Sequence, residues 1–314
     1  MTCLFGTVAV ASPSDWRYEW PRTDFSKSAV DYSEIMSGGP PKDGIPPIDR
    51  PLFKPQAEVR GLGEHEPVVS VSLNGDARAY PIGILIWHEI VNDTVGGVPV
   101  AVTFCPLCNT SIVFDRRLDG QVLDFGTTGK LRRSDLVMYD RQTESWWQQF
   151  LGEGIVGEMT GKRLKMVPAR LESISLFRAR HPEGLVLVPN DDRARAYGKN
   201  PYKGYDRLAA PFLYDGALPK GIAPLSRVVR VGDQAWSLAL LRRVGKIQTP
   251  DGLEITWREG QNSALDTATI KQGMDVGNVT VERTVNGNRM DVSYSVDFAF
   301  AFHAFHPDSE IWVR

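Results

Sequence analysis

Residues 87–115 have the sequence WHEIVNDTVGGVPVAVTFCPLCNTSIVFD, which contains the single Cys-x-x-Cys motif of the chain, Cys105-Pro106-Leu107-Cys108. The motif lies between two apolar runs, at 98–104 and 110–114. Both runs are rich in β-branched and aromatic residues, which favour strands. We therefore expect a β-hairpin with the cysteines in its turn, where two thiols can bind one metal ion or form a disulfide.

The composition is typical of a globular protein, with 42% hydrophobic and 24% charged residues. A chain of 314 residues is long enough for about two domain-sized units. The 36 basic and 38 acidic residues leave a formal charge of −2. There is no basic stripe with interleaved aromatic residues, which argues against nucleic acid as a partner. No apolar run reaches the roughly 20 residues of a transmembrane helix, so no transmembrane segment is expected.

The N-terminus resembles the end of a signal peptide. A short apolar stretch ends in Ala9-Val10-Ala11, and small residues at these positions are typical of a signal-peptidase site. Because a positively charged start is missing, we interpret residues 1–11 as a remnant signal peptide; a disordered apolar N-terminus is the alternative. Export would make the protein periplasmic or secreted and would remove Cys3. The two remaining cysteines would then lie in a compartment that allows a disulfide.

The rest of the chain is predicted to form short elements joined by turns. Residues 12–65 are rich in proline and glycine and predict an extended arm. Asn74-Gly75 predicts a hairpin, and Pro81 suits the first turn of a helix. The expected elements are strands at 68–73 and 77–80, a helix at 81–92, a hairpin at 119–120, a strand at 135–139, a helix at 173–180, a strand at 185–188 and an irregular connection at 190–225.

A degenerate internal repeat relates two parts of the chain. Short matches recur in the same order: the segment at 75–85 with 232–241, the strand after Gly97 with the strand after Gly252, and 177–183 with 302–308. The second copy has residues 258–262, Arg-Glu-Gly-Gln-Asn, where the first has its cysteines. We expect a β-rich α+β fold with a first module at 66–189 and a second, shorter module at 226–314.

Several stretches resemble a bacterial family catalogued as domain of unknown function 3179. They are KDGIPPID, ARAYPIGILIWHEIVNDTVGGVPVAVTFCPLC and SDLVMYDRQTESWWQQ, and the similarity extends from Lys42 to the C-terminus. The combination of Trp-His-Glu with Cys-Pro-Leu-Cys is fairly specific. This sequence differs in Asn109, where a glycine often follows the second cysteine, and in His306, where tyrosine is common. The resemblance implies no particular activity.

The cysteine turn is the first candidate for a metal site. Cys-Pro-x-Cys turns of iron and zinc knuckles direct both sulfurs at one ion, and Asn109 can adopt the left-handed conformation that glycine usually supplies. No second cysteine pair completes a tetrahedral site, so Cys105 and Cys108 need a histidine, a carboxylate or water. We expect copper, zinc or iron, with His88 as the further ligand and Glu89 and Asn109 in its surroundings. On the predicted helix, however, His88 would lie far from the end of the strand that carries Cys105.

Two other functions for the cysteine pair remain open. A thiol–disulfide oxidoreductase is one, although its cysteines normally begin a helix that lowers a thiol pKa, and here a strand follows. A binding module with a stapling disulfide is the other. Cys105 as an acyl-transfer nucleophile with His88 as its base is the least favoured alternative, because a second cysteine follows three residues later.

Three further groups of residues were considered as sites. Gly126–Lys130 and Arg132 could hold an anion in a glycine-loosened loop, with Lys130 and Arg132 as its cations, but the spacing of a phosphate loop is missing and a solvated hairpin is favoured. His303 and His306 could flank a metal, yet His306 matches His181 in the repeat, which favours a helix-end role. The adjacent tryptophans at 146–147 are expected in the core. Whether the protein is an enzyme stays open.

Overall fold

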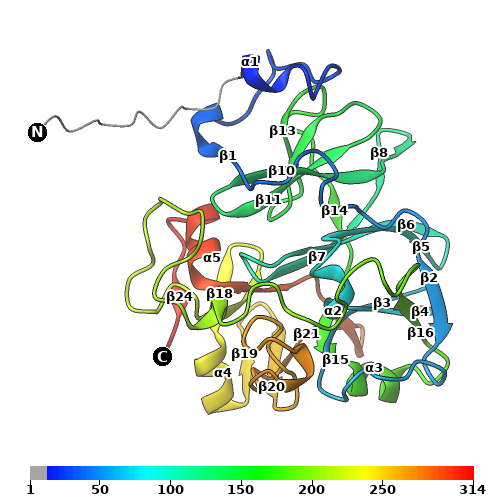
Figure 1. Ribbon diagram of the computed structural model, residues 1–314. Helices are drawn as coiled ribbons and strands as arrows, with labels where there is room; N and C mark the ends of the chain where they lie inside the picture. Colours follow the sequence, from blue (N-terminus) through cyan, green and yellow to red (C-terminus); the bar gives the residue numbers. More distant parts are fainter. Residues whose placement is uncertain (1–12) are drawn as a thin grey trace, which may run out of the picture.

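The β-rich architecture expected from the sequence is confirmed by the computed structural model, which describes residues 13–314 (Figure 1). The predicted signal remnant and Cys3 lie outside the described residues. The helices are short, none in the described range exceeding seven residues: α1 Pro13–Trp16, α2 Ile82–Leu85, α3 Ile174–Arg180, α4 Leu238–Val244 and α5 Ala299–Phe305. Three 3₁₀ turns lie at Tyr32–Glu34, Tyr205–Arg207 and Ile270–Gln272. No helix in residues 13–314 has the length and apolar character to cross a membrane.

The cysteine hairpin forms as the sequence predicts. Cys105 pairs with Thr110 across the turn, and the strands on either side are almost entirely buried. β-branched side chains on both faces of these strands explain why the hairpin lies inside the molecule. Its sheet has the order β14-β7-β6-β5, with strands β5 Ile90–Val95, β6 Val98–Cys105, β7 Thr110–Asp115 and β14 Lys165–Met166.

The helix predicted at 81–92 is wrong. Helix α2 ends at Leu85, the chain turns through Glu89 at φ +59°, and strand β5 begins at Ile90. The apolar spacing that suggested a helix belongs partly to a strand whose β-branched residues pair with β6, so tertiary pairing overrides the local pattern. The backbone N–H of Phe104 donates to the Glu89 carbonyl at 2.8 Å. Residues 88–89 therefore lie beside the cysteine end of β6, and the expected separation of His88 from the cysteines disappears.

A five-stranded antiparallel sheet lies above the cysteine hairpin in Figure 1. It has the order β1-β10-β11-β12-β13, and an aromatic cluster that includes Trp16, Trp20 and Trp146 packs against it. The expected burial of Trp146 and Trp147 is confirmed. The strands are β1 Ile35–Ser37, β10 Phe125–Arg132, β11 Asp135–Asp140, β12 Trp146–Gln148 and β13 Glu153–Val156; the small hairpin of β8 Arg117–Leu118 and β9 Gln121–Val122 turns at Asp119-Gly120 as predicted.

Two further sheets share one strand order. In the first half the order is β15-β3-β4-β16-β2, and in the second it is β23-β17-β18-β24. In both, the last strand of the shared set runs parallel to its neighbour and the other pairs are antiparallel. The strands are β2 Leu52–Pro55, β3 Pro67–Leu73, β4 Asp76–Pro81, β15 Arg170–Ser173 and β16 Leu185–Val188, and β17 Arg227–Val231, β18 Gln234–Ser237, β23 Ser295–Phe298 and β24 Ile311–Trp312.

The two halves of the chain share one hydrophobic core. The largest cluster of buried side chains includes Val102 and Phe104 of β6 together with Val296 and Phe298 of β23. Strand β23 packs beside β7, so the second half supports the cysteine hairpin directly. A last antiparallel sheet, β19-β20-β21-β22, completes the second half, with strands β19 Lys246–Gln248, β20 Leu253–Arg258, β21 Asn278–Val285 and β22 Asn288–Asp291.

Candidate metal centre

The cysteine turn has the conformation that its sequence favours. Asn109 takes a left-handed backbone conformation with φ +53°, as the sequence suggested, and its N–H donates to the Pro106 oxygen at 3.2 Å. Asparagine tolerates this region better than most residues because its short polar side chain can hydrogen-bond locally. The turn thus closes within four residues, with Cys105 at the end of β6 and Cys108 just before β7.

A second hairpin turn faces the cysteines. Arg133 and Ser134 join β10 to β11, and both have positive φ, at +54° and +66°. Non-glycine residues in this region are strained, and such strain concentrates at functional sites. The Ser134 backbone oxygen lies 3.8 Å from the Cys105 sulfur and 3.5 Å from the Cys108 sulfur. Both thiols are therefore directed at one point, where the second hairpin begins its return strand with Asp135.

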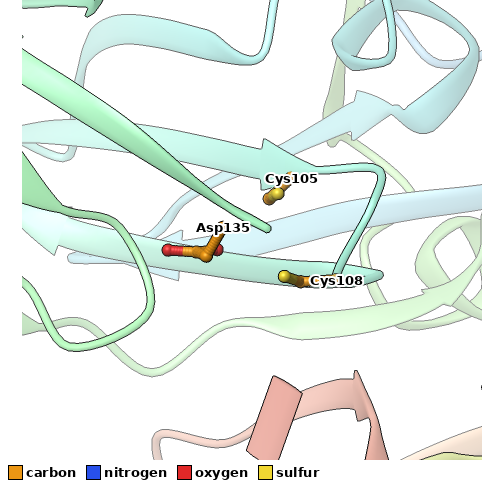
Figure 2. A group of neighbouring side chains, drawn as sticks. All are labelled: Cys105, Cys108 and Asp135. Carbon is orange, nitrogen blue, oxygen red and sulfur yellow. The ribbon is translucent and has the colours of Figure 1, made fainter. Parts of the chain in front are cut away.

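Cys105, Cys108 and Asp135 form the candidate metal centre. Their ligand atoms all lie within 4.8 Å of one another, and all three residues are buried (Figure 2). No disulfide joins the cysteines, which are both free. In residues 13–314 no other group of three His, Cys, Asp or Glu side chains places its ligand atoms this close. The arrangement can supply two thiolates and one carboxylate to a single ion and leaves at least one coordination position to another ligand.

Only one of the two carboxylate oxygens of Asp135 accepts hydrogen bonds from the polar groups around it. Its Oδ2 accepts from the Gln148 side-chain amide at 2.7 Å and from the Phe150 backbone N–H at 2.9 Å. Its Oδ1 is buried and has no hydrogen-bond partner. A buried oxygen without a partner costs free energy, and a metal ion on that oxygen would remove the cost. The residues present therefore fit a metal ion, with one carboxylate oxygen oriented by the protein and the other left to coordinate.

Burial makes every acidic group of the centre a weaker acid. It raises the pKa of Cys105 and raises that of Cys108 well above its ordinary value. It raises the pKa of Asp135 to about 7, against the opposing effect of the hydrogen bonds from Gln148 and Phe150 and of the nearby Cys105 thiol. Without a cation, the protein disfavours the ionised forms. A metal ion would supply the missing positive charge, because it binds thiolates and carboxylates in their deprotonated forms.

Residues from the second half of the chain hold the cysteine turn in place through hydrogen bonds. The backbone N–H of Phe298 donates to the Cys108 oxygen at 2.9 Å, and the Tyr205 hydroxyl donates to the Leu107 oxygen at 3.0 Å. The Thr110 hydroxyl donates to Asp297 at 2.8 Å, and Asp297 forms a buried ion pair with Arg230 at 2.9 Å. Hydrogen bonds between distant parts of the same chain hold the turn in one geometry, as a preorganised site requires.

His88 precedes Glu89, whose backbone oxygen accepts from Phe104, but it lies outside the three-residue centre. Its Nδ1 donates to the Pro46 oxygen at 2.7 Å, which fixes the neutral tautomer and leaves Nε2 to accept from the Tyr197 hydroxyl at 2.8 Å. Both ring nitrogens are thus already bonded, and burial lowers the pKa of the ring. The role of His88 as a metal ligand stays a prediction; in this geometry Asp135, and not His88, groups with the two cysteines.

Glu89 borders the centre without belonging to it. It is 7% exposed, and its side chain makes no hydrogen bond or ion pair within residues 13–314. Burial and the nearby charge of Asp135 raise its pKa to about 8. It lines a cavity of about 400 Å³ together with Cys105. Glu89 and Cys105 thus share a cavity wall, and the role of Glu89 in the surroundings of a metal ion stays a prediction.

The other predicted site residues have structural partners. The expected anion loop is part of strand β10, with a bulge between Thr127 and Lys130. Lys130 pairs with Glu19 at 3.1 Å, and Arg132 pairs with Glu34 at 2.8 Å. These cations are already balanced by carboxylates, which argues against a free anion site. Arg132 also donates to the Gln148 side chain at 3.3 Å and so orients the amide that holds Asp135.

The two histidines near the C-terminus, His303 and His306, have different surroundings; the His306 ring packs against Phe150 and Phe302. His306 caps the C-terminus of α5 as His181 caps α3, which is the correspondence expected from the repeat. Burial and Arg230 lower the pKa of His306 to about 4. His303 lies on a separate surface pocket with Arg133 and Tyr214.

Asp135 is the residue that the sequence analysis missed. It opens the stretch Ser134-Asp135-Leu136, which belongs to one of the segments that carry the family resemblance. A charged residue at the start of an otherwise apolar strand was the available signal. It lies 27 positions from Cys108 in the sequence, and only the packing of two hairpins from different sheets brings the two residues together.

Comparison with known families gives one match. The family model described as protein of unknown function (DUF3179) matches residues 42–309, which confirms the resemblance noted from the sequence. Comparison with curated proteins and with solved structures gave no match.

Proposed function

The chain belongs to the DUF3179 family of proteins of unknown function, and we propose that this member binds a metal ion through Cys105, Cys108 and Asp135. The observation that carries the proposal is the convergence of two free thiols on a buried carboxylate oxygen that has no other partner. The three groups come from two hairpin turns, and hydrogen bonds from both halves of the chain support them.

The donor set favours zinc or iron over copper. Two thiolates suit soft and borderline ions, whereas a carboxylate oxygen is a harder ligand that copper(I) binds poorly. Zn²⁺ accepts sulfur and oxygen together in tetrahedral sites, with three protein ligands and one open position where a site is not purely structural. The proposed centre has this form. Whether the ion is stored or takes part in catalysis is decided by what occupies the open position.

A thiol–disulfide oxidoreductase is the second candidate. Cys105 borders a cavity while Cys108 is fully buried behind it, an arrangement in which one thiol could meet a substrate and the other resolve the mixed disulfide. The raised pKa of both thiols argues against it, because the thiolate is the attacking species. A static disulfide is the third candidate; the two sulfurs lie within 4.8 Å of each other, and export to an oxidising compartment would favour it.

Internal duplication and export complete the proposal. An origin by duplication is supported by the shared strand order of two sets, β15-β3-β4-β16 and β23-β17-β18-β24. In each set a helix lies, in the sequence, between the first and the last strand named. The proline- and glycine-rich segment at 12–65 would then be an arm added to the pair. Export rests on the sequence of residues 1–11 alone, and mass spectrometry of the protein from cells should find a mature N-terminus near Ser12.

The test is metal affinity in matched variants. The purified reduced protein should bind one Zn²⁺ per chain in a competition titration with a chromogenic chelator. Cys105→Ser and Cys108→Ser should each abolish tight binding, and Asp135→Asn should weaken it at least about 10–100-fold. His88→Ala is the matched control, a nearby residue with both nitrogens engaged elsewhere, and should leave the affinity unchanged. Equal affinity in the cysteine variants and the wild type would reject the proposal.

A further inference from the structure

A cavity of about 400 Å³ opens beside the candidate centre and is not explained by metal binding. Its wall is mainly apolar, with Ile45, Leu107, Leu131, Leu136, Phe212 and Leu213 among the lining residues. The residues come from the cysteine turn, from the β10–β11 hairpin and from distant connections of the chain. A mostly apolar concavity of this size with a few polar groups is the usual form of a small-molecule site.

Glu89 is an acidic residue in the cavity wall whose side chain has no partner in residues 13–314. The residue is only 7% exposed and lines the cavity, and its carboxyl makes no hydrogen bond or ion pair in the described part of the chain. Its backbone is fixed on both sides, since its N–H donates to Leu85 at 2.6 Å and its oxygen accepts from Phe104 at 2.8 Å. The φ of +59° adds strain to this position. A buried carboxyl without a partner, on a strained backbone, is costly and therefore indicates a ligand group.

Among residues 13–314, no cationic side chain pairs with this carboxyl. Lys130 also lines the cavity, but its ammonium pairs with Glu19 at 3.1 Å and lies 5.4 Å from the centre of the Trp20 ring. Tyr202 lines the cavity as well, and the nearby charge of Glu89 contributes to its raised pKa after burial. The phenol and the carboxyl can both accept hydrogen bonds, so the polar part of the wall favours a donor-rich, positively charged group.

We propose that this cavity binds a small, mainly apolar molecule through a protonated amine that pairs with Glu89. The apolar body of the ligand would lie against the leucines and Phe212, and the ammonium would donate to Glu89 and to the Tyr202 oxygen. This inference does not require a metal ion at the neighbouring centre, which shares the wall at Cys105 and whose Asp135 contributes to the raised pKa of Glu89. The ligand would thus be a cation held by the Glu89 carboxyl, whereas the sequence suggested an anion held by Lys130 and Arg132.

Benzylamine is a suitable probe, and calorimetric titration of the full-length chain measures its binding. At about pH 8, close to the pKa of Glu89, the carboxyl is partly ionised. The fragment should bind once per chain with a Kd of about 1 mM or tighter. Benzyl alcohol should bind more weakly, and benzoate should not bind. Absence of benzylamine binding, or equal binding of benzoate, would overturn the proposal.

Two variants locate the interaction. Glu89→Gln should weaken benzylamine binding about 10–100-fold, because the loss removes a charge-assisted hydrogen bond. Leu131→Trp should fill the cavity and block the probe without touching Glu89, and it decides the location should Glu89→Gln fail to fold. Unchanged affinity in folded Glu89→Gln, or in Leu131→Trp, contradicts the assignment. Cys108→Ser removes the proposed metal centre but no lining residue, so benzylamine should still bind to it whether or not metal binding proves correct.

Discussion

The side-chain amide of Asn109 donates to the backbone oxygen of Val296 at 2.8 Å, and this bond joins the cysteine turn to strand β23. The two residues are 187 positions apart. The turn that carries the thiols is therefore a product of both halves of the chain, and its geometry depends on residues far outside the Cys-x-x-Cys motif.

Substitutions of Asn109 should separate the hydrogen bond from the backbone conformation. Asn109→Gly keeps the left-handed conformation and loses the bond to Val296, which should cost about 1 kcal/mol of unfolding free energy. Asn109→Ala loses the bond and adds about 1–2 kcal/mol of strain at φ +53°. Urea denaturation of the two variants should rank alanine below glycine, and the reverse order would show that the turn conformation is not a constraint.

The buried pair of Arg230 and Asp297 should be sensitive to the loss of one partner. Arg230→Met leaves a fully buried carboxylate without its cation and should cost about 3–5 kcal/mol. The exposed pair of Arg163 and Glu153 is the control, and Arg163→Met should change stability by less than about 1 kcal/mol. Chemical denaturation measures both. Similar losses in the two variants would contradict the supporting role given to β23.

The pKa of Glu89 predicts a pH dependence of stability. The pKa is raised from 4.5 to about 8, so between these values the folded protein keeps a proton that the unfolded chain releases. This group therefore lowers the unfolding free energy as pH rises through that window, by about 1.4 kcal/mol for each pH unit at most. Glu89→Gln abolishes the effect. Relative to wild type, the metal-free variant should gain a few kcal/mol between about pH 5 and pH 8.

The control for this prediction is Glu183→Gln, which removes an exposed carboxyl. Its stability relative to wild type should change little over the same range of pH. If Glu89→Gln and Glu183→Gln give parallel curves in urea denaturation, Glu89 ionises in the folded protein as it does in the unfolded chain, and its burial has no electrostatic consequence.

Metal binding should release protons. The pKa values of Cys105 and Cys108 are raised and that of Asp135 is about 7, so near neutral pH the metal-free protein keeps both thiols protonated and the carboxyl about half protonated. Zinc affinity should therefore increase with pH between about pH 6 and pH 8, with about two or more protons released per ion. Calorimetry in buffers of different ionisation enthalpy counts the protons. An affinity independent of pH would mean that the thiols are not ligands.

The sequence predicted the local elements well where residue type dictates backbone conformation. The hairpin at Asn74-Gly75 and the cysteine hairpin follow from turn residues and β-branched strands, and helix α3 and strand β16 lie where they were expected. The helix at 81–92 failed because pairing of β5 with β6 outweighs an apolar pattern that suits either structure.

The candidate site was predictable only in part, because the approach of Asp135 to the two cysteines depends on tertiary packing. The motif identified Cys105 and Cys108 directly. Asp135 comes from a different sheet and reaches the thiols through the strained Arg133-Ser134 turn, whose residues do not carry the usual asparagine–glycine signal. His88 was chosen because it was a good ligand type near the motif, but local sequence does not show that Pro46 and Tyr197 occupy its nitrogens.

X-ray absorption at the zinc edge, on the protein loaded with one equivalent of Zn²⁺, tests the proposed centre most directly. The expected spectrum has two sulfur scatterers at about 2.3 Å and oxygen scatterers at about 2.0–2.2 Å, without the outer-shell pattern of imidazole. Cys108→Ser should lose a sulfur scatterer or fail to bind the ion. A coordination shell without sulfur, or one that contains imidazole, would contradict a centre formed by Cys105, Cys108 and Asp135.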